Sequence, residues 1–102
     1  MVDVNWCQEN AFCIWENSGY NGRAFQSGYS TPSLTDNMNN RMTSYWNRTR
    51  FWVCLYEYPN YVQRLDIPGF KGVAPYSSSS NVGFTANDHL SSFKFAFSDS
   101  DC

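Results

Sequence analysis

The chain has little of the chemistry that enzymes and nucleic-acid-binding proteins commonly use. It has a single histidine, His89, so neither a histidine pair for zinc nor a Ser-His-Asp triad with a local signature is supported. Charged side chains make up only 16% of the 102 residues, and the 7 basic and 9 acidic ones are well mixed. No basic stripe indicates a nucleic-acid partner, and no charge block indicates a disordered tail. We therefore expect no enzyme and no nucleic-acid partner.

Long apolar runs are also absent. No stretch approaches the roughly 18 apolar residues needed to cross a bilayer, so no membrane partner is expected. The first six residues, Met-Val-Asp-Val-Asn-Trp, lack the basic start and apolar run of a signal peptide. Four cysteines, an even number, nevertheless favour an oxidising compartment over four free thiols in the cytosol. There is no Cys-x-x-Cys pair, which disfavours zinc. We expect a secreted protein whose leader has been removed.

The residues that are abundant indicate a β-protein. With 42% hydrophobic and 19% aromatic residues, the chain can build one core. Aromatic and β-branched residues cluster at 11–15, 50–56 and 92–97, separated by turn residues about every ten positions, as in an all-β sandwich or barrel. Phe93, Phe95 and Phe97 alternate with other residues, which predicts a strand with one face toward the core. We expect at most a short helical turn in the Asn-rich stretch 35–44, and a surface loop at 77–81.

Two short strings occur twice, which indicates a tandem duplication. Residues 39–44 read Asn-Asn-Arg-Met-Thr-Ser and residues 87–92 read Asn-Asp-His-Leu-Ser-Ser. Residues 15–22 and 56–63 both begin with an aromatic residue and Glu, and both have Tyr five positions after the aromatic. The second copy carries about seven extra residues, which we assign to the serine run at 77–80. Because half a chain is too small to bury its own core, the two copies should pack on each other.

These strings resemble the βγ-crystallin family. Its hallmark is an aromatic residue, four residues, an aromatic residue, one residue and Gly, present here as Trp15, Tyr20 and Gly22. The resemblance runs from residue 11 to 97 and implies a single domain, 1–102, with Greek key one at about 11–48 and Greek key two at about 50–98. The implied fold class is all-β, with two interlocked Greek-key motifs forming one β-sandwich. In the second copy Gln63 replaces the Gly that supplies a positive φ, so that hairpin is expected to be looser or differently closed.

The two repeated six-residue strings, 39–44 and 87–92, are called the hexamers below. Both match the calcium signature of that family, which reads Asn/Asp, Asn/Asp, two variable residues, Ser/Thr and Ser. Calcium prefers six to eight oxygen ligands, and the hexamers are rich in carbonyl, amide and hydroxyl oxygens. The resemblance implies that site one uses the carbonyls of Glu16 and Arg41, the Thr43 hydroxyl and the Asp88 carboxylate. It implies that site two uses the carbonyls of Glu57 and His89, the Ser91 hydroxyl and the Asn40 amide oxygen. The implied cofactor is Ca²⁺, two ions per chain; the alternative is that both hexamers are Asn-rich turns without an ion.

The spacing of Cys7 and Cys13 also looks like that of secreted bacterial proteins grouped with the Streptomyces metalloproteinase-inhibitor type. That resemblance favours a Cys7–Cys13 disulfide, which leaves Cys54 to pair with Cys102. The rival pairing joins Cys13 to Cys54, at equivalent positions of the two copies, and Cys7 to Cys102.

We therefore expect a secreted, monomeric, calcium-binding βγ-crystallin-like protein. One alternative is a proteinase inhibitor that docks a loop into a secreted protease. Another is a toxin-like surface-interaction protein using exposed aromatics such as Trp46 and Trp52. Fold alone does not separate these functions.

Overall fold

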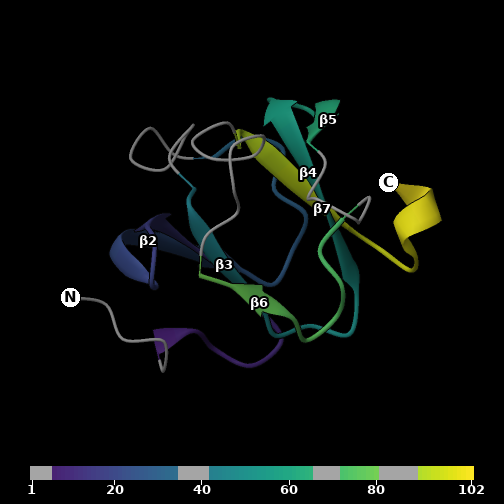
Figure 1. Cartoon of the computed structure of the whole chain (residues 1–102). Coiled ribbons are helices and arrows are strands. Elements are labelled where there is room, and N and C mark those ends of the chain that lie inside the picture. The colour runs from purple at the N-terminus through teal and green to yellow at the C-terminus, as the bar shows by residue number, and fades with distance from the viewer. Residues whose placement is uncertain (1–5, 35–41, 66–71, 81–89) are drawn as a thin grey trace.

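The computed structural model describes residues 6–34, 42–65, 72–80 and 90–102 (Figure 1). Its strands are β1 (Phe12–Asn17), β2 (Asn21–Ser27), β3 (Ser44–Asn47), β4 (Trp52–Tyr58), β5 (Val62–Leu65), β6 (Ser78–Ser79) and β7 (Ser92–Ala96). A 3₁₀ turn, Asp99–Asp101, follows the last strand. Within these ranges, no helix has the length and apolar character needed to span a bilayer. The expected all-β fold class is confirmed.

The two copies are interlocked through their sheets. One sheet has the order β2-β1-β3-β6 and the other has the order β5-β4-β7, and every strand pairing is antiparallel. Strand β6 comes from the second copy but pairs with β3 of the first, and the two run side by side in Figure 1. In exchange, Thr31 of the first copy bridges Phe93 of β7 through two backbone hydrogen bonds of 2.8 and 3.0 Å. Each copy therefore completes the sheet of the other.

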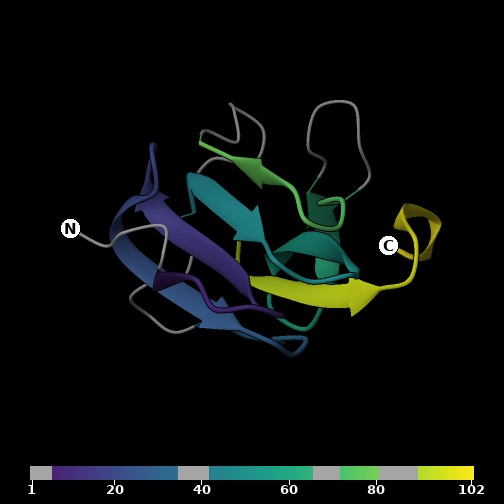
Figure 2. The ribbon, with the colours of Figure 1, turned by 90° about the horizontal axis from the view of Figure 1, so that it is seen from below.

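The core lies between the two sheets. Side chains alternate along each inner strand, so that Phe12 and Ile14 of β1 face Val53 and Leu55 of β4, and all four are fully buried. The Phe12 ring meets the Phe93 ring edge-on at a centroid distance of 5.0 Å, which joins the sheets directly. Figure 2 shows the arrangement, with the purple and blue strands of the first copy on one side and the yellow β7 toward the other. Both copies thus contribute buried apolar side chains to one core, as expected from the small size of each half.

Strand β1 is buried on both faces. Its outward side chains, Cys13 and Trp15, form a second small cluster with Cys7 and Ala11. Residues 6–10 therefore cover the outer face of the first sheet.

The sequence predicted a surface loop for the serine run at 77–80, but this run contains strand β6. The residues directly before and after β6 are also hydrogen-bonded through their backbone. Asn47 N–H donates to the Ser77 carbonyl at 2.8 Å, and Gly19 N–H donates to the Ser80 carbonyl at 3.0 Å. Ser79 pairs with Tyr45 as Thr31 pairs with Phe93, so Ser79 is the counterpart of Thr31 and the seven extra residues lie before it in the chain. The alternation of Phe93, Phe95 and Phe97 also ends early, because Phe97 lies beyond β7 and is 86% exposed.

The two hairpins close in the same way, so the expectation that the second one differs was wrong. Positive φ angles occur at equivalent positions, namely Gly19, Tyr20 and Gly22 in the first copy and Asn60, Tyr61 and Gln63 in the second. Gln63 has a φ of 63°, which lies in the left-handed region. A residue with a Cβ adopts this backbone conformation at a cost of about 1–2 kcal/mol. The second hairpin therefore keeps its shape against a local strain.

Replacing Gln63 with Gly should relieve that strain. We expect Gln63→Gly to raise the free energy of unfolding by about 1 kcal/mol, measured by urea denaturation. Gly22→Gln should lower it by more, because a Cβ at Gly22 would lie 2.6 Å from Asn17 Nδ2. Gln63→Ala is the matched control, because alanine retains the Cβ. An equal gain in the alanine variant would show that removal of the glutamine side chain, and not backbone strain, is responsible.

Candidate metal-binding loops

The last residue of each hexamer ties that hexamer to the hairpin of its own copy. The Ser44 hydroxyl donates to the Asn17 carbonyl at 2.7 Å and accepts the Tyr20 N–H at 3.2 Å. In the second copy, the corresponding bonds are Ser92 to the Tyr58 carbonyl at 2.7 Å and Tyr61 N–H to Ser92 at 3.1 Å. Both serines are fully buried. Each is therefore a structural residue whose loss would leave buried backbone groups without a partner.

The fifth residue of each hexamer lies beside a hairpin glutamate. Thr43 N–H donates to the Trp15 carbonyl at 2.9 Å, and Ser91 N–H donates to the Tyr56 carbonyl at 2.9 Å. Because each glutamate follows its aromatic residue directly, these bonds bring Thr43 next to Glu16 and Ser91 next to the glutamate that follows Tyr56. The register between β1 and β2 also shifts between Trp15 and Asn17, at Glu16. Four of the eight expected ligands are thus brought together as two matching pairs.

The other four expected ligands, Asn40, Arg41, Asp88 and His89, lie outside the described residues. The proposed exchange of Asn40 and Asp88 between the two sites therefore stays a prediction. In the part of the chain that the structure describes, no three His, Cys, Asp or Glu residues gather into a metal-binding group. A site made of carbonyl and hydroxyl oxygens does not require such a group, and the oxygens of the two pairs are the hard ligands that calcium prefers.

Aromatic pairs hold both hairpins against the sheets. The Trp15 and Tyr20 rings meet edge-on at 5.2 Å, and the Tyr56 and Tyr61 rings do the same at 5.7 Å. Burial, and to a lesser extent the nearby Tyr20 phenol, raises the pKa of Tyr45 above its usual value near 10. The Tyr45 phenol therefore stays neutral at physiological pH. The edge-on ring contacts indicate that the hallmark aromatic residues of both hairpins act in packing.

The two disulfides pair Cys7 with Cys13 and Cys54 with Cys102, which is the first of the two pairings considered from the sequence. The Cys54–Cys102 bridge anchors the C-terminal turn to β4. It also lies close to Gly72, where an added Cβ would approach the Cys102 sulfur to 3.1 Å.

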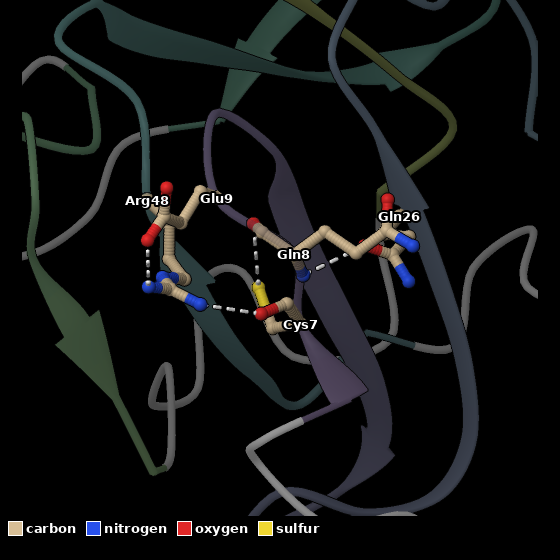
Figure 3. Close-up of polar contacts among 5 residues, drawn as sticks. All are labelled: Cys7, Gln8, Glu9, Gln26 and Arg48. Carbon is tan, nitrogen blue, oxygen red and sulfur yellow. Dashed lines mark hydrogen bonds and ion pairs between the residues drawn. The ribbon is translucent and has the colours of Figure 1, made fainter.

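The loop closed by Cys7 and Cys13 is held from outside by two side chains (Figure 3). Arg48 Nη1 donates to the Cys7 carbonyl at 2.7 Å. Gln26 accepts the Gln8 N–H at 3.0 Å, and its Nε2 also donates to the carbonyl of Trp6, the residue before the disulfide, at 3.2 Å.

Three consecutive side chains of this loop, Gln8, Glu9 and Asn10, are exposed. Glu9 makes a single long ion pair, 3.9 Å from Arg48 Nη2, in which its side chain stays 84% exposed. The loop is therefore an ordered, solvent-facing element. Sequence reasoning missed Gln26 and Arg48, since neither belongs to a motif and both contact the loop only through the fold.

The aromatic residues proposed for a toxin-like surface are not the most exposed ones. Trp46 and Trp52 are half-buried, and Trp46 carries the Arg48 guanidinium 4.8 Å above its ring. Among the described residues the large hydrophobic side chains that are at least half exposed are Tyr29, Tyr58, Val62, Tyr76 and Phe97. In this part of the chain, a surface-interaction role through apolar contacts would use these side chains.

Several solved βγ-crystallin structures share this fold. An archaeal βγ-crystallin aligns with a TM-score of 0.68 at 22% identity, covering 84% of this chain and 96% of the other. A βγ-crystallin domain from Clostridium beijerinckii aligns with a TM-score of 0.65 at 24% identity, covering 86% and 99%. A βγ-crystallin from Ciona intestinalis gives 0.68 at 16% identity, covering 84% and 99%. At these identities the likeness shows the fold alone.

No curated protein matches the chain in sequence. A family model, however, matches residues 3–67, which is more than half of the chain and includes the disulfide-closed loop, both hairpins' aromatic residues and the first hexamer. Through this match, and on a βγ-crystallin fold, the chain belongs to peptidase inhibitor family I36.

Proposed function

We propose that the chain is an extracellular, non-enzymatic protein that binds two calcium ions, one at each duplicated loop. The observation that carries the proposal is the repetition of the same hydrogen bonds in both copies. In each copy a serine and a backbone amide of the hexamer bond to the hairpin, which aligns a hydroxyl residue with the hairpin glutamate. The two disulfides support an oxidising, extracellular location.

The sites would gather oxygens from segments that are distant in sequence. At site one the Thr43 hydroxyl and the Glu16 carbonyl come from the first copy, and the Asp88 carboxylate comes from the second. At site two the Ser91 hydroxyl and the Glu57 carbonyl come from the second copy, and the Asn40 amide oxygen comes from the first. These oxygens would coordinate calcium, and because they come from both copies, the coordination would cross-link the two copies. The full proposed set is Glu16, Arg41, Thr43 and Asp88 for site one, and Glu57, His89, Ser91 and Asn40 for site two.

Isothermal titration of chelator-treated protein should resolve about two calcium ions per chain. Site one should be the tighter, because Asp88 contributes a full charge and Asn40 only an amide dipole. Asp88→Ala should therefore abolish the tighter event and Asn40→Ala the weaker one, whereas Asn40→Asp should narrow the difference.

A titration that stays flat at millimolar calcium would contradict the proposed function. Loss of the weaker event in Asp88→Ala would contradict only the crosswise exchange of ligands. Both outcomes can be read without an activity assay.

A second candidate function, inhibition of a secreted endopeptidase, is favoured by the family match. The disulfide-closed loop provides a suitable contact, because it is exposed and already ordered, so that docking would lose little conformational entropy. A panel of secreted metallo- and serine proteases would test the function. If a protease is inhibited through this loop, Glu9→Ala should weaken inhibition while Tyr58→Ala, exposed on β4, should not. Equal loss in both variants, or none in either, would assign the contact elsewhere.

A further inference from the structure

A cavity of about 320 Å³ lies where the two copies join. It is bounded by the loop before β1, the chain after β2, the connection between β3 and β4, and the end of β7. Its lining residues are Asn10, Gly28, Thr49, Arg50, Phe51 and Phe95. None of them is an expected calcium ligand, and only Asn10 belongs to the disulfide-closed loop. The cavity is therefore distinct from the proposed calcium sites and touches the proposed protease contact only at its edge.

One wall of the cavity is aromatic. The Phe51 and Phe95 rings are nearly parallel, with an interplanar angle of 12° and centroids 6.0 Å apart. The exposed Phe97 ring extends this wall outside the cavity and meets Phe51 edge-on at 5.6 Å. Phe51 and Phe95 are only half-buried. An aromatic group of a ligand could thus remove further ring surface from water and stack or pack edge-on.

The same cavity carries one positive charge. The Arg50 guanidinium carbon lies 5.0 Å from the Phe51 ring centroid, and the Arg50 side chain is exposed. In the described ranges Arg50 forms no salt bridge, whereas Arg23 and Arg48 each have a glutamate partner. No acidic side chain among the described residues lines the cavity. On a chain of net charge −2, a cation beside an aromatic wall selects for a carboxylate, because guanidinium groups bind carboxylates through two parallel hydrogen bonds.

We propose that this cavity binds a carboxylate carried on a short stem from an aromatic ring. The ring would pack on Phe51 and Phe95, and the carboxylate would pair with Arg50. The size fits, since a closed cavity of about 150 Å³ can hold benzene, and twice that volume accommodates a ring with a short side chain. A free aryl carboxylic acid and the C-terminus of a peptide ending in phenylalanine share this chemistry.

Amide NMR titration of the full chain with 3-phenylpropionate tests the proposal. We expect shifts confined to the lining residues, around 10, 28, 49–51 and 95, with a dissociation constant on the order of 1–10 mM for so small a ligand. The uncharged 3-phenylpropionamide should bind at least about fivefold more weakly, because it cannot form the charged pair. Equal binding of acid and amide, or shifts spread over other surfaces, would overturn the proposal.

Arg50→Gln should weaken 3-phenylpropionate about tenfold and abolish the preference for the acid. Arg23→Gln, on β2 outside the cavity, is the matched control and should leave both unchanged. An Arg50→Gln variant that retains the preference would overturn the proposal, and its amide spectrum would show whether the fold is intact.

A last comparison separates the two sources of the carboxylate. A tetrapeptide ending in free phenylalanine should bind more tightly than 3-phenylpropionate if the ligand is a peptide terminus. If the natural ligand is a small acid, the tetrapeptide should bind no more tightly. Either result supports the assignment of the cavity to an aryl carboxylate, whereas binding of neither probe overturns it.

Discussion

Calcium removal is expected to lower the melting temperature of the protein by about 10–20 °C. A ligand that binds only the folded chain stabilises it by RT ln(1 + [L]/Kd), which is about 2.7 kcal/mol at a hundredfold excess over Kd. With few charged ligands per site, we expect dissociation constants on the order of 10⁻⁵ to 10⁻³ M, so millimolar calcium provides that excess at the tighter end. In a domain of this size each kcal/mol shifts the melting temperature by about 4–8 °C.

The measurement is a thermal melt followed by circular dichroism, with chelator and with increasing calcium. Magnesium at equal concentration is the control, because Mg²⁺ requires a tighter octahedral shell and retains its waters. A melting temperature that does not respond to calcium would mean that both hexamers are turns without a bound ion. The hydrogen bonds of Ser44 and Ser92 would then be the sole reason for the repeated pattern in the described residues.

Local patterns in the sequence predicted much of this fold. The aromatic spacing at Trp15 and Tyr20, and again at Tyr56 and Tyr61, located both hairpins, because ring packing against a strand requires that spacing. The repeated Ser at the end of each hexamer was also informative, since its hydroxyl makes the same two bonds in both copies. These features were predictable because they involve residues that are close in sequence, or a repeat that is visible within one sequence.

Features that depend on tertiary pairing were not predicted. Strand β6 consists of serines, which give no apolar alternation, and it is a strand only because Tyr45 and Trp46 of β3 offer it a sheet edge. Likewise Gln63 adopts a positive φ because the fold imposes the hairpin shape on a residue that does not favour it. In both cases long-range contacts outweigh local preference.

The sequence predicted which residues would supply ligand oxygens at the candidate sites, but it did not predict the long-range contacts that hold the exposed loops in place. The hexamer pattern identified Thr43 and Ser91, and the structure places each beside its hairpin glutamate. Nothing in the sequence indicated that Arg48 and Gln26 would hold the disulfide-closed loop, because these contacts span 41 and 18 residues along the chain. Such supporting contacts have no motif, and they are determined by how the sheets assemble.

Removal of the Cys54–Cys102 disulfide is expected to cost about 4 kcal/mol of unfolding free energy, more than removal of the other bridge. In the chain-entropy model a disulfide stabilises by restricting the unfolded chain, and the effect grows with the length of the loop it closes. The cysteines of this pair are separated by 48 residues and those of the Cys7–Cys13 pair by 6. The same model gives about 2.4 kcal/mol for the shorter loop.

Two double variants, Cys54→Ala with Cys102→Ala and Cys7→Ala with Cys13→Ala, allow a direct comparison by denaturant unfolding. Alanine avoids placing a new hydroxyl at Cys54, Cys7 or Cys13, all of which are fully buried. The long-loop variant should be the less stable by roughly 1.5–2 kcal/mol. The reverse order would show that the short bridge stabilises the native state directly, by holding residues 7–13 over the Trp15 cluster, and that unfolded-chain entropy is the smaller effect.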